Sequence, residues 1–175
     1  FKIDAASGDS VHIWPDDVTV KNNCIVGEGP TGGVNGIVYT HSGSQTMGGT
    51  VEGNTVHNCS DAGVALMSWA APSVVNNSVL NNTVYGCYDD EPSEMEDFSA
   101  GILLFSGFSG NVSGNTIEGN EVYDSWTGIY GWSLYCGNLS DNTIAGNTVH
   151  HTIWGIALNA SRCLRSHFFV GATIR

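Results

Sequence analysis

Hydrophobic and polar residues alternate in short segments that recur along the chain. The segment Thr50–His57 places valines at its second and seventh positions, each between polar neighbours. Alternation with a period of two is typical of half-buried β-strands. Further copies lie at residues 19–26 (degenerate), 78–85, 116–123 and 143–150. The pattern predicts two short strands in each copy, with a bend between them.

A third short strand is predicted after each copy, where a glycine precedes an apolar stretch, at residues 36–39, 63–66, 101–104, 128–131 and 155–158. The steps between the equivalent residues Val20, Val51, Val79, Ile117 and Ile144 are 31, 28, 38 and 27 residues. One unit of this length cannot bury its apolar side alone, whereas stacked units bury it in continuous columns. We therefore predict an all-β solenoid, a parallel β-helix of about six coils with three short parallel sheets and a buried aliphatic column.

Asparagine occupies one position in every copy, as Asn23, Asn54, Asn82, Asn120 and Asn147. A sharp bend favours a left-handed backbone, which Asn tolerates well, and we expect these residues to adopt it. Stacked amides can also hydrogen-bond along the column. This combination resembles the right-handed parallel β-helix superfamily, which includes pectate lyases, polygalacturonases and mannuronan epimerases. The resemblance covers about residues 10–160.

We predict a single domain over residues 1–175, with regular coils over about 10–160 and an irregular C-terminal segment over 161–175. The chain opens at Phe1 without a methionine, so we expect a processed or excised segment. The resemblance implies a secreted, periplasmic or cell-surface location. Uncapped coil ends are bare sheet edges, which favour pairing with another chain.

The net charge of the chain and its lack of long apolar runs limit the kinds of partner that it can bind. Five basic residues against seventeen acidic ones give a net charge of −12, so we expect no nucleic-acid binding. No apolar run approaches the ~20 residues of a membrane-spanning helix, so we expect no membrane partner. The acidity is explained either by solubility or by a site for cations.

The glycine-initiated strands predict an apolar outer face. Alternation from the inward aliphatic residues places Met67, Leu103, Phe105, Tyr130 and Trp132 on the outside. A contiguous apolar surface of this kind rarely stays open to water. Three explanations remain open: cover by the chain's own loops (chiefly residues 86–100), a homo-oligomer interface, or a sugar-stacking platform formed by Met67, Phe105, Tyr130 and Trp132.

A second outward column contains Val26, His57, Tyr85, Tyr123 and His150. We interpret it mainly as stacked side chains that stabilise a sheet, with ligand binding as the alternative.

The loop at residues 86–98 is the main departure from the repeat, and six of its residues are carboxylates. Carboxylate oxygens are the ligands that calcium prefers, so Asp89, Asp90, Glu91 and Glu94 are candidate Ca²⁺ ligands. A solvated acidic loop without a metal explains the same residues.

Catalytic candidates are the carboxylates Asp89, Asp90 and Asp124, with His151 as an acid/base partner. The short motifs of the superfamily's lyases, hydrolases and epimerases are absent. Three functions therefore remain open: polysaccharide recognition through the aromatic face and the acidic loop, a polysaccharide lyase, hydrolase or epimerase, and a non-catalytic scaffold.

The cysteines fall into two aligned pairs, Cys59 with Cys87 and Cys136 with Cys163, while Cys24 has no aligned partner. Stacked positions lie ~4.8 Å apart, within the range that a disulfide accepts. Each pair is predicted to be either a disulfide or two packed thiols, and Cys24 to be free.

Overall fold

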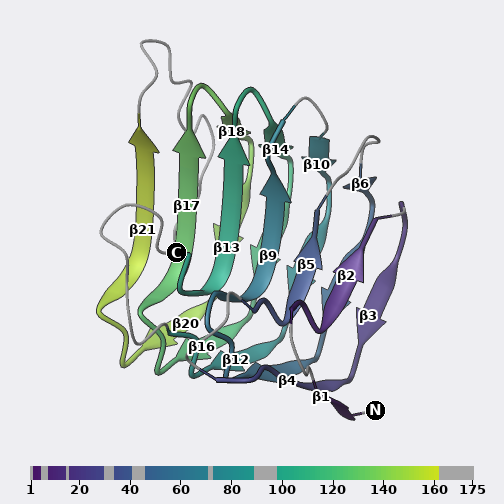
Figure 1. The fold of residues 1–175 in the computed structure, drawn as a ribbon, viewed down its shortest axis with the longest axis vertical. Coiled ribbons are helices and arrows are strands. Elements are labelled where there is room, and N and C mark those ends of the chain that lie inside the picture. Colours follow the sequence, from purple (N-terminus) through teal and green to yellow (C-terminus); the bar gives the residue numbers. More distant parts are fainter. Residues whose placement is uncertain are drawn as a thin grey trace.

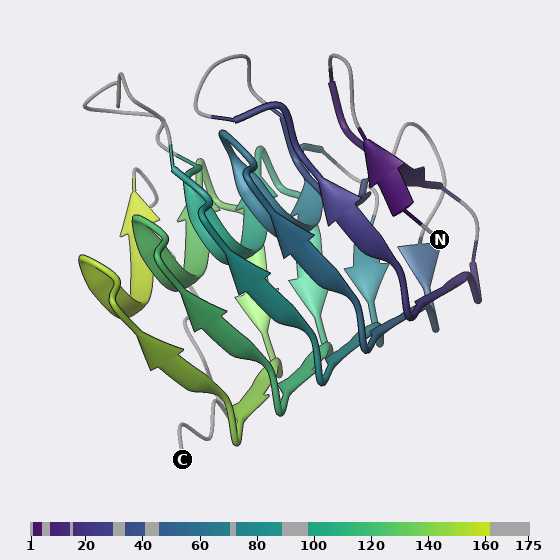
Figure 2. The ribbon, with the colours of Figure 1, turned by 90° about the horizontal axis from the view of Figure 1, so that it is seen from below.

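The computed structural model describes residues 2–4, 8–14, 16–29, 34–40, 46–70, 73–88 and 98–161. These residues form 21 strands that wind into about five stacked turns, running from β1 and β2 at one end to β20 and β21 at the other (Figures 1 and 2). The described residues contain no helix, and so none that could cross a membrane. The predicted all-β parallel solenoid is confirmed, with about five turns instead of six.

Four parallel sheets form the walls of the solenoid. Sheet A contains β1 (Lys2–Asp4), β4 (Cys24–Val26), β8 (Thr55–His57), β12 (Thr83–Tyr85), β16 (Glu121–Tyr123) and β20 (Thr148–His150). Sheet B contains β2 (Val11–Ile13), β5 (Ile37–Tyr39), β9 (Ala62–Ser68), β13 (Ala100–Gly107), β17 (Thr127–Leu134) and β21 (Trp154–Ser161). Sheet C contains β3 (Thr19–Lys21), β7 (Thr50–Glu52), β11 (Ser78–Leu80), β15 (Thr116–Glu118) and β19 (Thr143–Ala145).

Sheet D is the sheet that the sequence reasoning missed. It contains β6 (Thr46–Met47), β10 (Ser73–Val75), β14 (Asn111–Ser113) and β18 (Asn138–Ser140). Its buried residues Val74, Val112 and Leu139 stack in register and extend the core column. The prediction of three sheets was therefore wrong, because the turns contain a further strand of two or three residues directly before the strand of sheet C.

The aliphatic column follows the predicted register. Val20 pairs with Val51, which pairs with Val79, and the column continues through Ile117 to Ile144. The inward aliphatic residues of the copies at 50–57, 78–85, 116–123 and 143–150 were predicted to be buried, and all of them except Val149 are. The buried residues are Val51, Val56, Val79, Val84, Ile117, Val122 and Ile144. Val149 is only half-buried, because it lies in the last described turn and no described strand of sheet A follows β20.

The bends between strands of sheets C and A use a left-handed residue, but not the predicted one. Positive φ angles occur one position earlier, at Asn22, Gly53, Asn81, Gly119 and Gly146. The asparagine that follows keeps its side chain inside the stack, where it hydrogen-bonds along the column. The bend and the ladder are thus divided between two neighbouring residues.

The predicted asparagine ladder is present. Asn82 Nδ2 and the Asn82 backbone N–H both donate to Asn120 Oδ1, each at 2.9 Å, and the same bonds join Asn54 to Asn82 and Asn120 to Asn147. A second ladder connects Asn77, Asn115 and Asn142 between sheets D and C. Because buried amides without partners are costly, the two ladders also fix the register of the turns.

Candidate functional site

The outer face of sheet B is apolar, as predicted, but most of it is covered within the chain. Phe105 and Leu103 are fully buried, Trp132 is 5% exposed and Met67 is 9% exposed. They belong to a second apolar cluster outside the solenoid core. Three of the four predicted platform residues therefore offer no open face to a sugar, and only Tyr130 stays half-buried.

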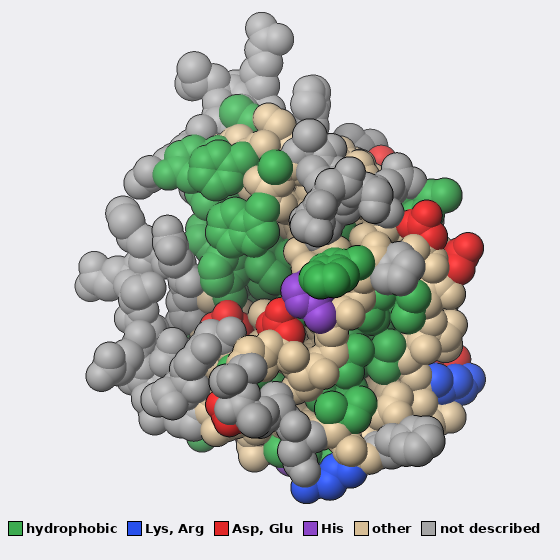
Figure 3. Space-filling view, turned by 45° about the vertical axis from the view of Figure 1, so that its right-hand side comes forward, with side chains coloured by type: hydrophobic (Ala, Val, Ile, Leu, Met, Phe, Trp, Pro, Cys, Tyr) green, Lys and Arg blue, Asp and Glu red, His purple; other side chains and the backbone are tan. Residues whose placement is uncertain are grey.

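Aromatic side chains from outside the repeat provide this cover. The Phe98 ring, which precedes β13, lies 5.1 Å from the Phe105 ring and 5.3 Å from the Trp132 ring. The Trp69 ring, which follows β9, lies 4.5 Å from the Phe105 ring. Of the three explanations for the apolar face, cover by the chain's own loops therefore accounts for the burial of these side chains. Figure 3 shows hydrophobic side chains gathered in a large group toward the upper left of that view.

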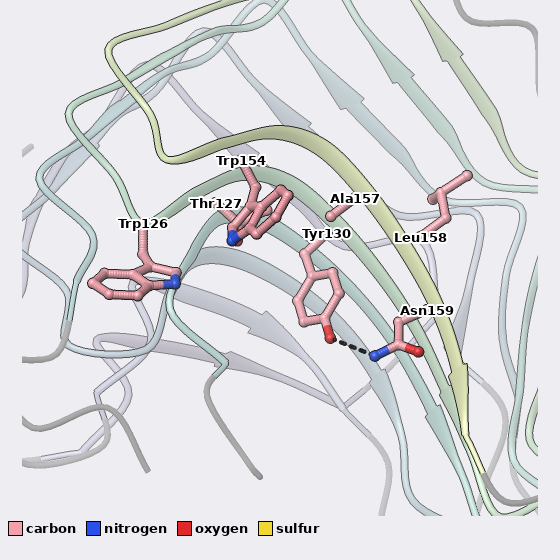
Figure 4. A pocket seen from close by; sticks show the side chains of 7 residues that line it. All are labelled: Trp126, Thr127, Tyr130, Trp154, Ala157, Leu158 and Asn159. Carbon is pink, nitrogen blue, oxygen red and sulfur yellow. Dashed lines mark hydrogen bonds between the residues drawn. The ribbon is translucent and has the colours of Figure 1, made fainter. Parts of the chain in front are cut away.

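An open groove lies on the outer side of sheet B, at its C-terminal turns, with a volume of about 380 Å³. Figure 4 shows its lining side chains, with two indole rings on one side and a phenol and an amide further along β17 and β21. The lining residues are Trp126, Thr127, Tyr130, Trp154, Ala157, Leu158 and Asn159.

The groove results from a change of side-chain size along two outward columns. Leu103 pairs with Tyr130, which pairs with Ala157, so a small residue follows two large ones. Phe105 pairs with Trp132, which pairs with Asn159. The smaller residues of β21 leave one side of Tyr130 uncovered. Asn159 Nδ2 donates to Tyr130 Oη at 3.4 Å and orients the phenol along the groove floor.

The two indoles come from the bends that lead into sheet B. Trp126 lies in the bend between β16 and β17 and is half-buried. Trp154 opens β21 and is 60% exposed, and its backbone N–H donates to Trp126 O at 3.1 Å. Sequence reasoning missed both residues because it followed the strand columns. A signal was available, since a tryptophan stands one or two residues before Gly128 and Gly155 alike.

The structure brings together the predicted pair Asp124 and His151. His151 Nδ1 lies 3.8 Å from Asp124 Oδ1, and both side chains are more than half exposed. Next to them His150 Nε2 lies 3.6 Å from Glu121 Oε1. Exposed pairs of this kind contribute little to stability. The two pairs matter instead for the local charge, because their carboxylates, Glu121 and Asp124, stand within a few residues of Trp126 along the chain.

No group of three or more His, Cys, Asp or Glu side chains among the described residues is arranged to hold a metal ion. The calcium candidates Asp89, Asp90, Glu91 and Glu94 lie outside the described residues. The catalytic roles of Asp89 and Asp90 fall there too, so both the calcium site and these roles stay predictions.

The second outward column is a ladder of parallel rings on sheet A. His57 stacks on Tyr85 at 4.8 Å, Tyr85 on Tyr123 at 4.9 Å and Tyr123 on His150 at 5.1 Å, with interplanar angles of 4–7°. Burial and the nearby Tyr85, Glu121 and Asp124 raise the pKa of Tyr123. Rings stacked this closely cover one another's faces, which supports the sheet-stabilising interpretation.

For each aligned cysteine pair the sequence left open a disulfide or two packed thiols, and the structure decides between them for Cys59 and Cys87. Cys59 and Cys87 are free, buried thiols, so the disulfide between them was wrong. Cys24 is free, as predicted. Cys136 is disulfide-bonded, and Cys163, its partner in the aligned repeat, lies outside the described residues. Each of the two free thiols donates to a carbonyl of its own turn, Cys59 to His57 O at 3.8 Å and Cys87 to Tyr85 O at 3.7 Å, so they pack without a bridge.

Comparison with known families agrees with the fold. The family model described as a right-handed beta helix region matches residues 9–170. The chain therefore belongs to the right-handed β-helix family. No curated protein and no solved structure matches it significantly. The family fixes the architecture, and the function has to be argued from the groove.

Proposed function

We propose that this domain binds a glycan chain in the groove on sheet B. The observation that carries the proposal is the exposed indole of Trp154 beside Trp126 and Tyr130, in a groove that also contains hydroxyl and amide groups. Aromatic rings pack on the apolar faces of pyranose rings, while neighbouring polar groups bond to the sugar hydroxyls.

The shape of the groove favours an extended ligand. Trp154 and Asn159 lie five residues apart on one strand, a distance of ~17 Å along β21. This span exceeds the length of a single sugar ring. The groove therefore fits an oligosaccharide that lies along the strands, with one end on the indoles and the other at the Tyr130–Asn159 pair.

A binding panel of neutral and acidic oligosaccharides tests the proposal, with affinity measured by titration calorimetry. Trp154→Ala should weaken binding of any ligand found by tenfold or more, since an aromatic anchor is lost. Trp14→Ala is the matched control, because Trp14 is 57% exposed at the other end of sheet B. Equal losses in the two variants, or no binding by the wild type, would contradict the proposal.

The same panel separates binding from catalysis. A domain that only binds returns every oligosaccharide unchanged, whereas a hydrolase releases new reducing ends and a lyase releases unsaturated uronides. The exposed Asp124–His151 pair is the described candidate for such chemistry, and Asp124→Asn would abolish it.

A further inference from the structure

We infer that the groove selects uncharged glycans and rejects uronate chains. The inference rests on the proposed function and adds the ligand's charge class to it. It is drawn from the lining groups of the groove and from the charges around it.

The described polar groups that line the groove are all neutral. They are the Thr127 hydroxyl, the Tyr130 phenol and the Asn159 amide. Such groups match the hydroxyls of an uncharged sugar. None of them supplies the paired N–H donors with a positive charge that bind a carboxylate strongly.

Among the described residues, the charges nearest to the groove along the chain are negative; Arg162, three residues after Asn159, lies outside the described residues. Asp124 lies two residues before Trp126, and Glu121 opens the same strand of sheet A that leads into this bend. Their side chains are 61% and 53% exposed. Within the described residues, Lys2 and Lys21 are the only Lys or Arg side chains, and both lie at the opposite end of the solenoid.

A uronate chain carries one carboxylate on each sugar. Placed in this groove, it would bring like charges together without a described Lys or Arg side chain to compensate, which is unfavourable by an amount that falls as salt rises. A neutral chain avoids this cost and keeps the contacts with the indoles and with the Tyr130–Asn159 pair. The overall charge of −12 acts in the same direction.

The test compares a matched ligand pair: the neutral oligosaccharide that binds best in the panel, and the same oligosaccharide oxidised at C6 to the uronate. We expect the oxidised form to bind at least about tenfold more weakly at low salt. The difference should shrink at about 1 M salt, where charges are screened over ~3 Å. The variant E121Q should recover part of the lost affinity for the oxidised form and leave affinity for the neutral form unchanged, because Glu121 is not a described lining residue of the groove.

Binding of the oxidised form that equals or exceeds that of the neutral form would overturn the inference and leave glycan binding intact. That result would assign the carboxylate contacts to the arginines outside the described residues, Arg162, Arg165 and Arg175. Binding of uronate chains alone in the panel would overturn it in the same way. Absence of binding by every glycan would overturn the proposed function and this inference together.

Discussion

Gly101 lies directly against the side chain of Val122, which belongs to the following turn. A Cβ atom at position 101 would clash with Val122 Cγ1 and stand 2.9 Å from the carbonyl oxygen of Gly128. The same relationship joins Gly36 to Val56, and Gly63 to Val84. Glycine therefore stands near the start of these strands of sheet B because the valine column of sheet A occupies the space that a side chain would need.

This contact predicts that Gly101→Ala destabilises the protein by several kcal/mol, because overpacking here meets backbone as well as a branched side chain, at ~1–3 kcal/mol or more. Gly155→Ala is the matched control, since no atom of the described residues lies within 4 Å of a Cβ built at that position. Urea unfolding measures both. Similar losses in the two variants would contradict the packing account.

The asparagine ladder predicts a large cost for Asn120→Ala. This change removes the acceptor of the Asn82 N–H and amide and leaves Val79 O without its donor, all in a buried position. Each buried polar group left unpaired costs about 1–3 kcal/mol. Asn23→Ala, at the half-buried end of the ladder, should cost about 1 kcal/mol or less, because water replaces the lost bonds. Equal costs in denaturant unfolding would argue against cooperation along the column.

We predict that Cys87→Ser is tolerated, because the turn that follows each strand of sheet A makes the same hydrogen bond with either cysteine or serine. The thiols of Cys59 and Cys87 donate to the carbonyl two residues earlier, at 3.8 and 3.7 Å, and the hydroxyl of Ser125 makes the same contact in the next turn at 3.1 Å. Serine already occupies this column, so we expect a change in unfolding free energy of about 1 kcal/mol or less.

Thiol labelling provides a second check on the same column. In the native protein a thiol reagent should modify the half-buried Cys24 first, and Cys59 and Cys87 only on unfolding, because both are fully buried. Peptide mapping that recovers a Cys59–Cys87 disulfide from the native protein would contradict the structure.

Stability should fall at alkaline pH in two stages. The pKa of the Cys59 thiol is raised by its hydrogen bond with the Cys87 thiol and by burial. Burial also raises the pKa of Tyr39 to about 12. A group whose folded pKa is raised contributes its stability below the unfolded pKa and loses it as pH rises. The loss therefore begins near pH 8.5–9 for the thiol and near pH 10 for the phenol.

Cys59→Ser isolates the first stage. Its unfolding free energy should stay level up to about pH 10, where the Tyr39 contribution of about 2–3 kcal/mol begins to disappear. Urea titrations at half-unit steps of pH measure the onset in the variant and in the wild type. An onset near pH 9 in both proteins would rule out the thiol as its cause.

Local alternation was enough to predict the strands at Thr50–Glu52 and Thr55–His57 and their register with later copies. It did not reveal sheet D, since a strand such as Asn111–Ser113 has one aliphatic residue between two small polar ones and resembles a turn. The asparagine directly before the later strands of sheet C, at Asn77, Asn115 and Asn142, was the available signal for the second ladder.

The candidate site was only partly predictable for a different reason. Alternation gave the outward direction of Phe105 and Trp132 correctly, but exposure depends on what packs over the sheet. Phe98 and Trp69 lie outside the repeat, so the periodicity could not predict their contacts. The open groove appears instead where Ala157 and Asn159 replace larger residues in the last turn.

The indole N–H signals of the five tryptophans test the central claim most directly. A titration with the best-binding neutral oligosaccharide, followed by ¹H–¹⁵N NMR, should shift the signals of Trp126 and Trp154. The signals of the exposed Trp14 and Trp69, which lie away from the groove, should stay in place. Shifts confined to Trp14 or Trp69, or an unchanged spectrum at saturating oligosaccharide, would contradict glycan binding in this groove.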